Sequence, residues 1–371
     1  MVNYTIGVSV IGCGGSVGRQ TLDVIEANPD RFSLISATVN RDVRRLAETA
    51  ARFSPRYTGA VSVDGPEANF TALNTPGVDV AVVAMTGSYG FSVALEAVRK
   101  VKRVALANKE SLVLGGELLM SEAKRCGTEL IPVDSEHSAV FQCLMGQDIS
   151  RLNKIILTAS GGPFFGYTAD MLEDVTPEAA VKHPTWKMGP KISVDSATMM
   201  NKGLELIEAG YFFDTRRLSY IVHPESIVHS MVEMADGSVL MQAAPTSMEI
   251  PIAFALSYPD RVAYRSSLDL AAVGKLTFYK PDEENFPFPR LAVRALEAGG
   301  CYPAALCVAD DAAVSLFLDR KIKFSDIYRI CERIVTKGDY NINVNEKSIE
   351  YVVKEVTALV NSDYRKLIRS C

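Results

Sequence analysis

The segment "PVDSEHSAV", residues 132–140, directly follows an apolar run and holds Asp134, Glu136 and His137, all potential metal ligands or acid/base groups. Asp134 and Glu136 are two positions apart, so both carboxylates point the same way when the segment is extended. Two hard oxygen ligands on one side suit Mg²⁺ or Mn²⁺ better than Zn²⁺. A solvated loop also carries such a pair, so a metal site needs a third carboxylate. Glu205 is the candidate, because it lies one helical turn after Asn201 on the same face.

Two further segments carry polar groups of the kind that bind phosphate. In "LTASGGPF" a predicted strand ends at Ser160, whose hydroxyl stands beside the bare backbone of two glycines. In "SVDSATMMNKGLELIEAGYFF" the residues Ser196, Asn201 and Lys202 come at the start of a predicted helix. A helix N-terminus with a lysine and small polar side chains favours an anion. A plain turn and an ordinary exposed helix are the alternatives.

A glycine-rich turn near the N-terminus predicts a dinucleotide site. "IGVSVIGCGGSVG" is a β-branched strand followed by Gly12, Gly14, Gly15 and Gly18, and a helical pattern comes next. Strand, tight turn and helix N-terminus is the arrangement that holds a pyrophosphate. After a second strand, "FSLISATV", NAD enzymes usually place an acidic residue, but here Arg41 stands near that point. Arg41 favours NADPH over NADH, unless it is only a solvated residue opening the next helix.

The middle third of the chain holds all four histidines and the single tryptophan. His183, Trp186 and Met188 lie in "KHPTWKMGPKIS", a non-periodic segment rich in proline and glycine. Such a loop often closes over a site and excludes water, although one buried tryptophan pinning a loop is the alternative. His229 alternates with Met231 on one face of a predicted strand, so a satisfied buried histidine is as good an interpretation as a functional one.

The order of predicted elements indicates an α/β fold with three parts. Alternating strands and helices in the first third predict a Rossmann-like parallel sheet, with ligands beyond the carboxyl ends of its strands. Asp236-Gly237 predicts a hairpin, so the middle is a central α+β catalytic domain. Four amphipathic patterns at the end predict a C-terminal helical bundle. The expected boundaries are 1–133 for the NADPH-binding domain, 134–258 for the catalytic domain with a lid loop at 182–193, 259–284 for a linker, and 285–371 for the bundle.

Composition excludes several classes of protein. The chain of 371 residues has a formal net charge of -5, with no stripe of Lys or Arg, which argues against a nucleic-acid partner. Its apolar runs are short and interrupted by charges, so no membrane span is expected. Seven cysteines without regular spacing, and an N-terminus without a signal-like pattern, are typical of a reducing compartment, so we expect a cytoplasmic protein.

Taken together, the motifs resemble the 1-deoxy-D-xylulose 5-phosphate reductoisomerase family along the whole chain. The blocks that carry the resemblance are "LANKES", "PVDSEHSA", "ASGGPF", "HPTWKMGPKISVDSATMMNKGLE", "VHPESIVHSMV" and "DGSV", in the family's order. The resemblance implies rearrangement of a phosphorylated ketose by retro-aldol cleavage and re-addition, followed by hydride transfer from NADPH. It also implies one divalent cation (Mg²⁺, Mn²⁺ or Co²⁺) and a homodimer.

The resemblance also implies residue roles. The implied metal ligands are Asp134, Glu136 and Glu205. The implied catalytic residues are Lys109, Glu136, His183, Trp186 and His229. The implied substrate contacts are Ser135, Glu136, Ser160, His183, Ser196, Asn201, Lys202 and Glu205. The implied cofactor contacts are Gly12, Gly14, Gly15, Ser16, Val17, Gly18, Asn40, Arg41, Asn108, Lys109, Glu110, Met188 and Gly189.

The sequence departs from the family at two cofactor segments. The family's first turn reads GSTGSIG, and Cys13 and Gly14 replace its Ser and Thr, so two hydroxyls are missing. The family's "GRN" appears as Asn40-Arg41-Asp42, and Asp42 brings a negative charge near the expected 2′-phosphate. Two other functions stay open: an aldehyde or semialdehyde dehydrogenase using Cys143 as nucleophile, and a dinucleotide-sensing protein without catalysis.

Overall fold

The structure is a computed structural model that describes residues 5–182, 189–263 and 267–369. Contacts between Cα atoms divide the chain into two compact units. The first unit comprises 1–111, 119–147 and 241–272, and the second comprises 112–118, 148–240 and 273–371. Each unit is therefore built from segments that are distant in the sequence.

The first unit is built on a six-stranded parallel sheet in the order β3-β2-β1-β4-β5-β6. This order is the one expected of a dinucleotide-binding fold, and it confirms the predicted Rossmann-like sheet. The central strands read as continuous apolar runs because helices cover both faces of such a sheet. The strands are β1 (Ile6–Ile11), β2 (Phe32–Val39), β3 (Tyr57–Ala60), β4 (Val80–Val83), β5 (Arg103–Leu106) and β6 (Glu129–Pro132).

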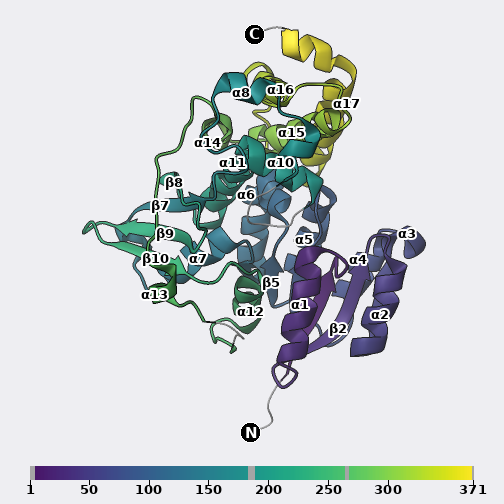
Figure 1. Ribbon diagram of the computed structural model, residues 1–371. Helices are drawn as coiled ribbons and strands as arrows, with labels where there is room; N and C mark the ends of the chain where they lie inside the picture. Colours follow the sequence, from purple (N-terminus) through teal and green to yellow (C-terminus); the bar gives the residue numbers. More distant parts are fainter. Residues whose placement is uncertain (1–4, 183–188, 264–266, 370–371) are drawn as a thin grey trace. The chain divides into compact units, whose positions relative to one another are not determined.

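Helices follow most of these strands, as the alternating pattern predicts (Figure 1). One of these helices is irregular: α6 begins at Lys109, and buried apolar residues both precede and follow Gly115. The backbone of Gly115 is non-helical (φ -149°, ψ 41°), so a kink interrupts the period there. The helices assigned wholly or mainly to this unit are α1 (Ser16–Ala27), α2 (Val43–Phe53), α3 (Val61–Asp64), α4 (Glu67–Leu73), α5 (Tyr89–Lys100), α6 (Lys109–Cys126), α7 (Ser135–Leu144), α12 (Glu249–Ser257) and α13 (Leu270–Val273).

Helix α12 completes the core of the first unit, although it lies more than a hundred residues after β6. It packs against α1, and Ile252, Phe254 and Leu256 are buried in one cluster with Val8 and Leu22. All-round apolar character explains the burial, since a helix without a polar face is a core element. The contact-based units thus differ from the expected boundaries, which placed residues 134–258 in a single domain.

Most of the second sheet belongs to the second unit; it has four strands in the order β10-β9-β7-β8, and only Val239 and Leu240 of β10 are assigned to that unit. Strand β7 pairs in parallel with β8 and antiparallel with β9. The predicted turn at Asp236-Gly237 lies between β9 and β10, where Gly237 adopts φ +84°. The strands are β7 (Leu152–Ala159), β8 (Leu218–Val222), β9 (Val228–Met234) and β10 (Val239–Ala243). The mixed sheet confirms the α+β prediction for the middle of the chain.

The four predicted C-terminal helices are all present, and Figure 1 shows them in green to yellow. Helix α15 is buried along most of its length, and it packs against α16 and α17. The helices of this unit are α8 (Ala169–Glu173), α9 (Pro177–Ala180), α10 (Pro190–Thr198), α11 (Met200–Phe212), α14 (Phe288–Ala298), α15 (Tyr302–Leu318), α16 (Phe324–Lys337) and α17 (Glu346–Arg369), with a short 3₁₀ turn η1 (Ile149–Arg151). The fold class is therefore as predicted.

One predicted loop is partly helical. Of the lid loop expected at 182–193, residues 183–188 lie outside the described residues, and residues from Pro190 onward belong to α10. Proline suits the first position of a helix because its missing N–H has no intrahelical partner there. The proline and glycine content that indicated a loop is thus partly the start signal of a helix.

Candidate active site

The glycine turn after β1 has the close approaches that a pyrophosphate cradle requires. Gly12 adopts φ +90°, and a Cβ there would lie 2.9 Å from the carbonyl oxygen of Ala84. A Cβ on Gly18 would lie only 2.3 Å from the carbonyl oxygen of Gly12. The N-cap residue Gly15 has no side chain that bonds the first N–H groups of α1. These N–H groups are therefore not capped by a side chain, and their dipoles favour an anion.

The two departures from the family pattern have local explanations. The Cys13 side chain is buried in the core of the first unit, and burial raises the pKa of its thiol to about 11. Asp42 is the N-cap of α2: its carboxylate accepts a hydrogen bond from the Arg45 N–H at 3.0 Å and lies 3.6 Å from Arg45 Nε. The Asp42 charge is thus engaged by its own helix. Arg41 is exposed beside it.

The segment after β5 binds the neighbouring loop through side chains. Asn108 is buried, and its amide donates to the carbonyl oxygen of Met85 at 3.1 Å and to the Glu110 carboxylate at 2.7 Å. Glu110 in turn accepts from the Gly87 N–H at 3.1 Å. Asn108 and Glu110 therefore hold the loop that follows β4, at the carboxyl edge of the sheet where a cofactor is expected.

The carboxylate pair lies at the carboxyl end of β6, as predicted. Asp134 is the N-cap of α7 and Glu136 lies in its first turn, and their ligand oxygens lie within 4.8 Å of each other. Lys109 Nζ contacts Asp134 Oδ2 at 2.9 Å, and the Ser135 hydroxyl donates to Glu136 Oε2 at 2.6 Å. The resemblance implies that these four residues act around one metal and substrate, and their side chains lie together in the first unit.

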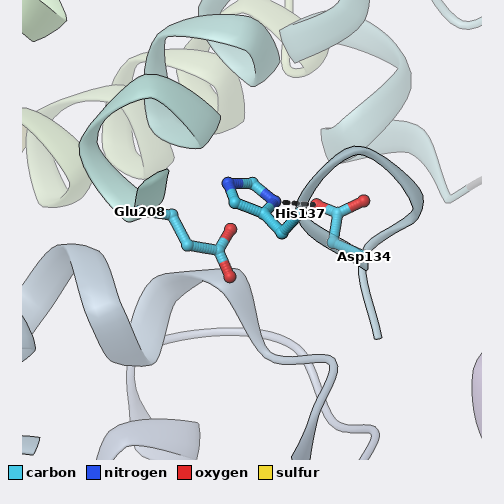
Figure 2. A group of neighbouring side chains, drawn as sticks. All are labelled: Asp134, His137 and Glu208. Carbon is cyan, nitrogen blue, oxygen red and sulfur yellow. Dashed lines mark ion pairs between the residues drawn. The ribbon is translucent and has the colours of Figure 1, made fainter. Parts of the chain in front are cut away.

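Figure 2 shows the His137 ring and the Asp134 carboxylate facing each other at the start of α7. His137 Nδ1 lies 3.9 Å from Asp134 Oδ2, and the His137 side chain is fully buried. This separation is that of an ion pair if the histidine is protonated, and it is longer than a hydrogen bond. The sequence prediction left His137 out of the ligand set, although its three-residue spacing from Asp134 was a usable signal. The figure also draws Glu208 of α11, a buried carboxylate of the second unit.

The second unit brings two of the predicted phosphate-binding segments side by side. Gly161 and Gly162 both have positive φ, +89° and +69°, and the Gly162 N–H donates to the Ser160 hydroxyl at 3.3 Å. A Cβ on Gly162 would lie 2.4 Å from the carbonyl oxygen of Ser196, at the end of α10. Glycine is therefore needed for this close approach, which places the Ser160 turn next to Ser196.

The other predicted residues of this group share the first turns of α11. Lys202 and Glu205 are both buried and form an ion pair, and the Asn201 amide also donates to the Glu205 carboxylate. Two opposite charges that are removed from water together stabilise each other, whereas either one alone is costly. The Lys202 ammonium and the Glu205 carboxylate thus form a buried pair of opposite charges near the start of α11.

The remaining predicted residues are placed as follows. His229 lies on β9 and is buried, with its carbonyl oxygen accepting from the Thr158 hydroxyl at 2.7 Å. Gly189 is the N-cap residue of α10. Ser16, Val17 and Asn40 lie at the glycine turn and after β2. His183, Trp186 and Met188 lie outside the described residues.

Cys143, the nucleophile of the alternative dehydrogenase hypothesis, is a poor candidate. Burial raises the pKa of its thiol to about 11, so it is protonated at neutral pH. A nucleophilic cysteine needs a lowered pKa, which usually comes from a nearby cation or helix N-terminus. Cys143 instead lies near the end of α7, so the dehydrogenase hypothesis lacks a suitable nucleophile at this position.

Comparison with known proteins gives matches along the chain. Family models described as 1-deoxy-D-xylulose 5-phosphate reductoisomerase, its C-terminal domain, and the DXP reductoisomerase C-terminal domain match residues 8–64 and 58–116, 130–213, and 243–361 respectively. The chain belongs to this family. The resemblance recognised in the motifs is therefore confirmed.

Curated relatives and solved structures agree with this assignment. The chain is 44% identical to the enzyme of Clostridium beijerinckii, covering 95% of this chain and 98% of the relative. It is 41% identical to that of a Geobacillus species, covering 98% and 99%. The Zymomonas mobilis structure in complex with NADPH is 38% identical, with a TM-score of 0.90 over 99% of this chain and all of that one. A DOX-P reductoisomerase solved with NADPH, fosmidomycin and magnesium is 34% identical, with a TM-score of 0.92 over 99% and 100%.

Among residues 5–182, 189–263 and 267–369, none of the helices combines the length and the apolar character that crossing a bilayer needs.

Proposed function

We propose that this protein converts 1-deoxy-D-xylulose 5-phosphate into 2-C-methyl-D-erythritol 4-phosphate, with NADPH as reductant and one divalent cation. The observation that carries the proposal is its membership of the reductoisomerase family over nearly the whole chain, together with relatives solved with NADPH and magnesium. The reaction serves isoprenoid biosynthesis by the non-mevalonate route. Local geometry in each unit supports individual parts of the proposal.

The glycine turn fits the pyrophosphate of NADPH, which supplies the hydride when it is bound. The close approaches at Gly12 and Gly18 keep the turn tight against the start of α1, whose first N–H groups have no side-chain cap. Gly14, Gly15, Ser16 and Val17 would complete this cradle.

The rest of the cofactor site would come from residues outside the glycine turn. Arg41 would contact the 2′-phosphate, because Asp42 is engaged in capping α2. Asn40, Asn108, Lys109, Glu110, Met188 and Gly189 would line the remaining cofactor surface.

Asp134, Glu136 and Glu205 would hold the cation, which when bound polarises the substrate carbonyl as a Lewis acid. An all-carboxylate donor set fits Mg²⁺, Mn²⁺ or Co²⁺. The first unit supplies Asp134 and Glu136 with neighbouring ligand oxygens, and the second supplies the buried Glu205. Lys109 and Ser135 already contact this carboxylate pair, and they would bind the substrate hydroxyls.

Ser160, Ser196, Asn201 and Lys202 would bind the substrate phosphate. The support is the side-by-side placement of the Ser160 turn and Ser196, and the buried Lys202 ammonium on α11. The phosphate does not react, so its binding energy would orient the rest of the substrate.

The histidines and the tryptophan would enclose the substrate. His229 would line the substrate site from β9. His183 and Trp186 would exclude water from the substrate, as the sequence predicts for the lid loop.

We also propose a homodimer in a bacterial cytoplasm. The scattered free cysteines suit a reducing compartment. Strand β10 lies at the edge of its sheet, with Val239 and Met241 40% and 49% exposed. An apolar edge strand of this kind favours contact with a second copy.

The deciding experiment is to follow NADPH oxidation with 1-deoxy-D-xylulose 5-phosphate, first with Mg²⁺ and then with EDTA. Oxidation that requires the metal supports substrate, cofactor and metal together. Oxidation that continues in EDTA would refute the metal assignment. NADPH binding without any turnover would favour the dinucleotide-sensing alternative.

A further inference from the structure

A group of charged side chains joins α10 to α15 in the second unit. None of these residues has a role in the function proposed above. Lys191 Nζ lies 2.6 Å from Asp195 Oδ2, 2.6 Å from Asp310 Oδ2 and 3.0 Å from Asp311 Oδ1. Asp195 and Asp310 are 3% and 0% exposed. One ammonium thus holds two buried carboxylates and a third, half-buried one.

The two buried carboxylates face the same ammonium, because Oδ2 of Asp195 and Oδ2 of Asp310 each lie 2.6 Å from Lys191 Nζ. Burial, followed by the charge of the other carboxylate, raises the pKa of Asp195 well above its ordinary value, and burial raises that of Asp310. The remaining oxygen of each, Oδ1, is buried without any other partner among the described residues. Lys191 is therefore the cation on which both buried carboxylates depend.

The position of this network relates it to the predicted phosphate site. Lys191 and Asp195 lie one turn apart on the same face of α10, and Ser196 is the residue directly after Asp195. Helix α10 ends at Thr198, and the next residue, Met199, adopts φ +65° before α11 begins at Met200. The direction of α10 thus fixes where both Ser196 and the start of α11 lie.

We infer that Lys191, Asp195 and Asp310 are positioning residues, which fasten α10 to α15 so that Ser196 meets the phosphate of the substrate. The inference rests on the proposed function, because it assumes that Ser196 binds phosphate. The Ser160 turn supports it independently. A Cβ on Gly162 would lie 2.4 Å from the carbonyl oxygen of Ser196, so a small shift of α10 changes the space between the two segments. None of the three residues needs to touch the substrate.

The test variant removes one charge of each sign, because loss of the Lys191 ammonium alone would leave two buried carboxylates without their cation. Lys191→Met combined with Asp310→Asn removes one charge of each sign at nearly constant volume. The readouts are the KM for 1-deoxy-D-xylulose 5-phosphate, the Kd for NADPH and the Kd for inorganic phosphate. We expect KM and the Kd for phosphate to rise about tenfold or more, with the Kd for NADPH within about twofold of wild type.

A surface ion pair of the same unit provides the matched control. Glu178 and Arg320 pair with side chains 61% and 63% exposed, so Glu178→Gln should change none of the three constants. A lower melting temperature with an unchanged Kd for phosphate would assign the network to stability alone and overturn the inference. If the double variant does not fold, Asp195→Asn and Asp195→Ala decide instead. The amide mimics a protonated carboxyl, so phosphate affinity should persist in the first and fall in the second; equal affinities would overturn the inference.

Failure of the proposed function gives a different result. Wild-type protein without metal-dependent NADPH oxidation would refute the reaction, whereas inorganic phosphate binding still measures the effect of the network. Active wild-type protein whose double variant binds phosphate normally would refute the inference alone.

Discussion

Replacing Gly18 with alanine should disable the cofactor turn, because no side chain fits at that position. A Cβ there would lie 2.3 Å from the carbonyl oxygen of Gly12, and 2.6 Å from Cα and 2.9 Å from the carbonyl carbon of Cys13. All three atoms belong to the backbone, which adjusts less easily than a flexible side chain. The turn itself must therefore move away from α1.

The size of the effect follows from two opposing terms. Overpacking of this kind costs about 1–3 kcal/mol. Alanine inside a helix gains about 1 kcal/mol over glycine, so the net loss of stability should be about 0–2 kcal/mol. NADPH binding should suffer more, because displaced N–H groups no longer converge on the pyrophosphate. A tenfold rise in Kd corresponds to about 1.4 kcal/mol, and we expect at least that.

Fluorescence titration of NADPH measures this effect, and the same turn provides the control. A Cβ on Gly14 would meet nothing closer than Val39 Cγ1 at 3.4 Å, so Gly14→Ala should bind NADPH almost normally. Wild-type affinity in Gly18→Ala, or a larger loss in Gly14→Ala than in Gly18→Ala, would show that the close approach does not shape the cofactor site.

Four other outcomes are expected. Glu205→Gln should lower turnover by orders of magnitude and raise the metal concentration required; near-normal activity at low Mg²⁺ would remove Glu205 from the ligand set. Lys202→Ala should weaken phosphate-bearing ligands by about 1.5–3 kcal/mol, and an equal loss for a ligand without phosphate would contradict that role. Arg41→Ala should narrow the preference for NADPH over NADH, whereas an unchanged ratio of the two Kd values would leave Arg41 as a surface residue. The Cys13 and Cys143 thiols have a pKa of about 11 in the folded protein against an ordinary 9.0, so the unfolded chain loses these protons first. The two protonated thiols should therefore contribute fully to the free energy of unfolding below pH 9, and this contribution should fall as the pH rises toward 11. Alanine at both positions should weaken the pH dependence of the melting temperature. An undiminished pH dependence would assign the effect to other groups.

Local sequence patterns predicted much of the fold because they depend on neighbouring residues. The apolar run before Gly12 and the Asp236-Gly237 turn each specify their own conformation, and both were found as expected. Strand β3 has four residues, and an edge strand that short gives almost no periodic signal. The non-helical backbone of Gly115 likewise interrupts the period of α6.

The sequence also predicted chemistry that lies within single segments. Asp134 and Glu136 in one turn, and Asn201, Lys202 and Glu205 in another, carry their spacing in the chain itself. The spacing did not reveal which charged side chains pair with each other. The pairing of Lys109 with Asp134 and the enclosure of His137 depend on the side-chain positions that packing produces.

By itself, the sequence determined the family and the strand-turn-helix of the cofactor turn, because each is encoded in contiguous residues, and it predicted the candidate carboxylates. Only the tertiary structure decided that α12 completes the first core, that Gly162 lies against Ser196, and that Lys191 holds two aspartates from different helices. These contacts join residues that are far apart along the chain. Their energy comes from burial and charge pairing in the folded state, and no local periodicity records it.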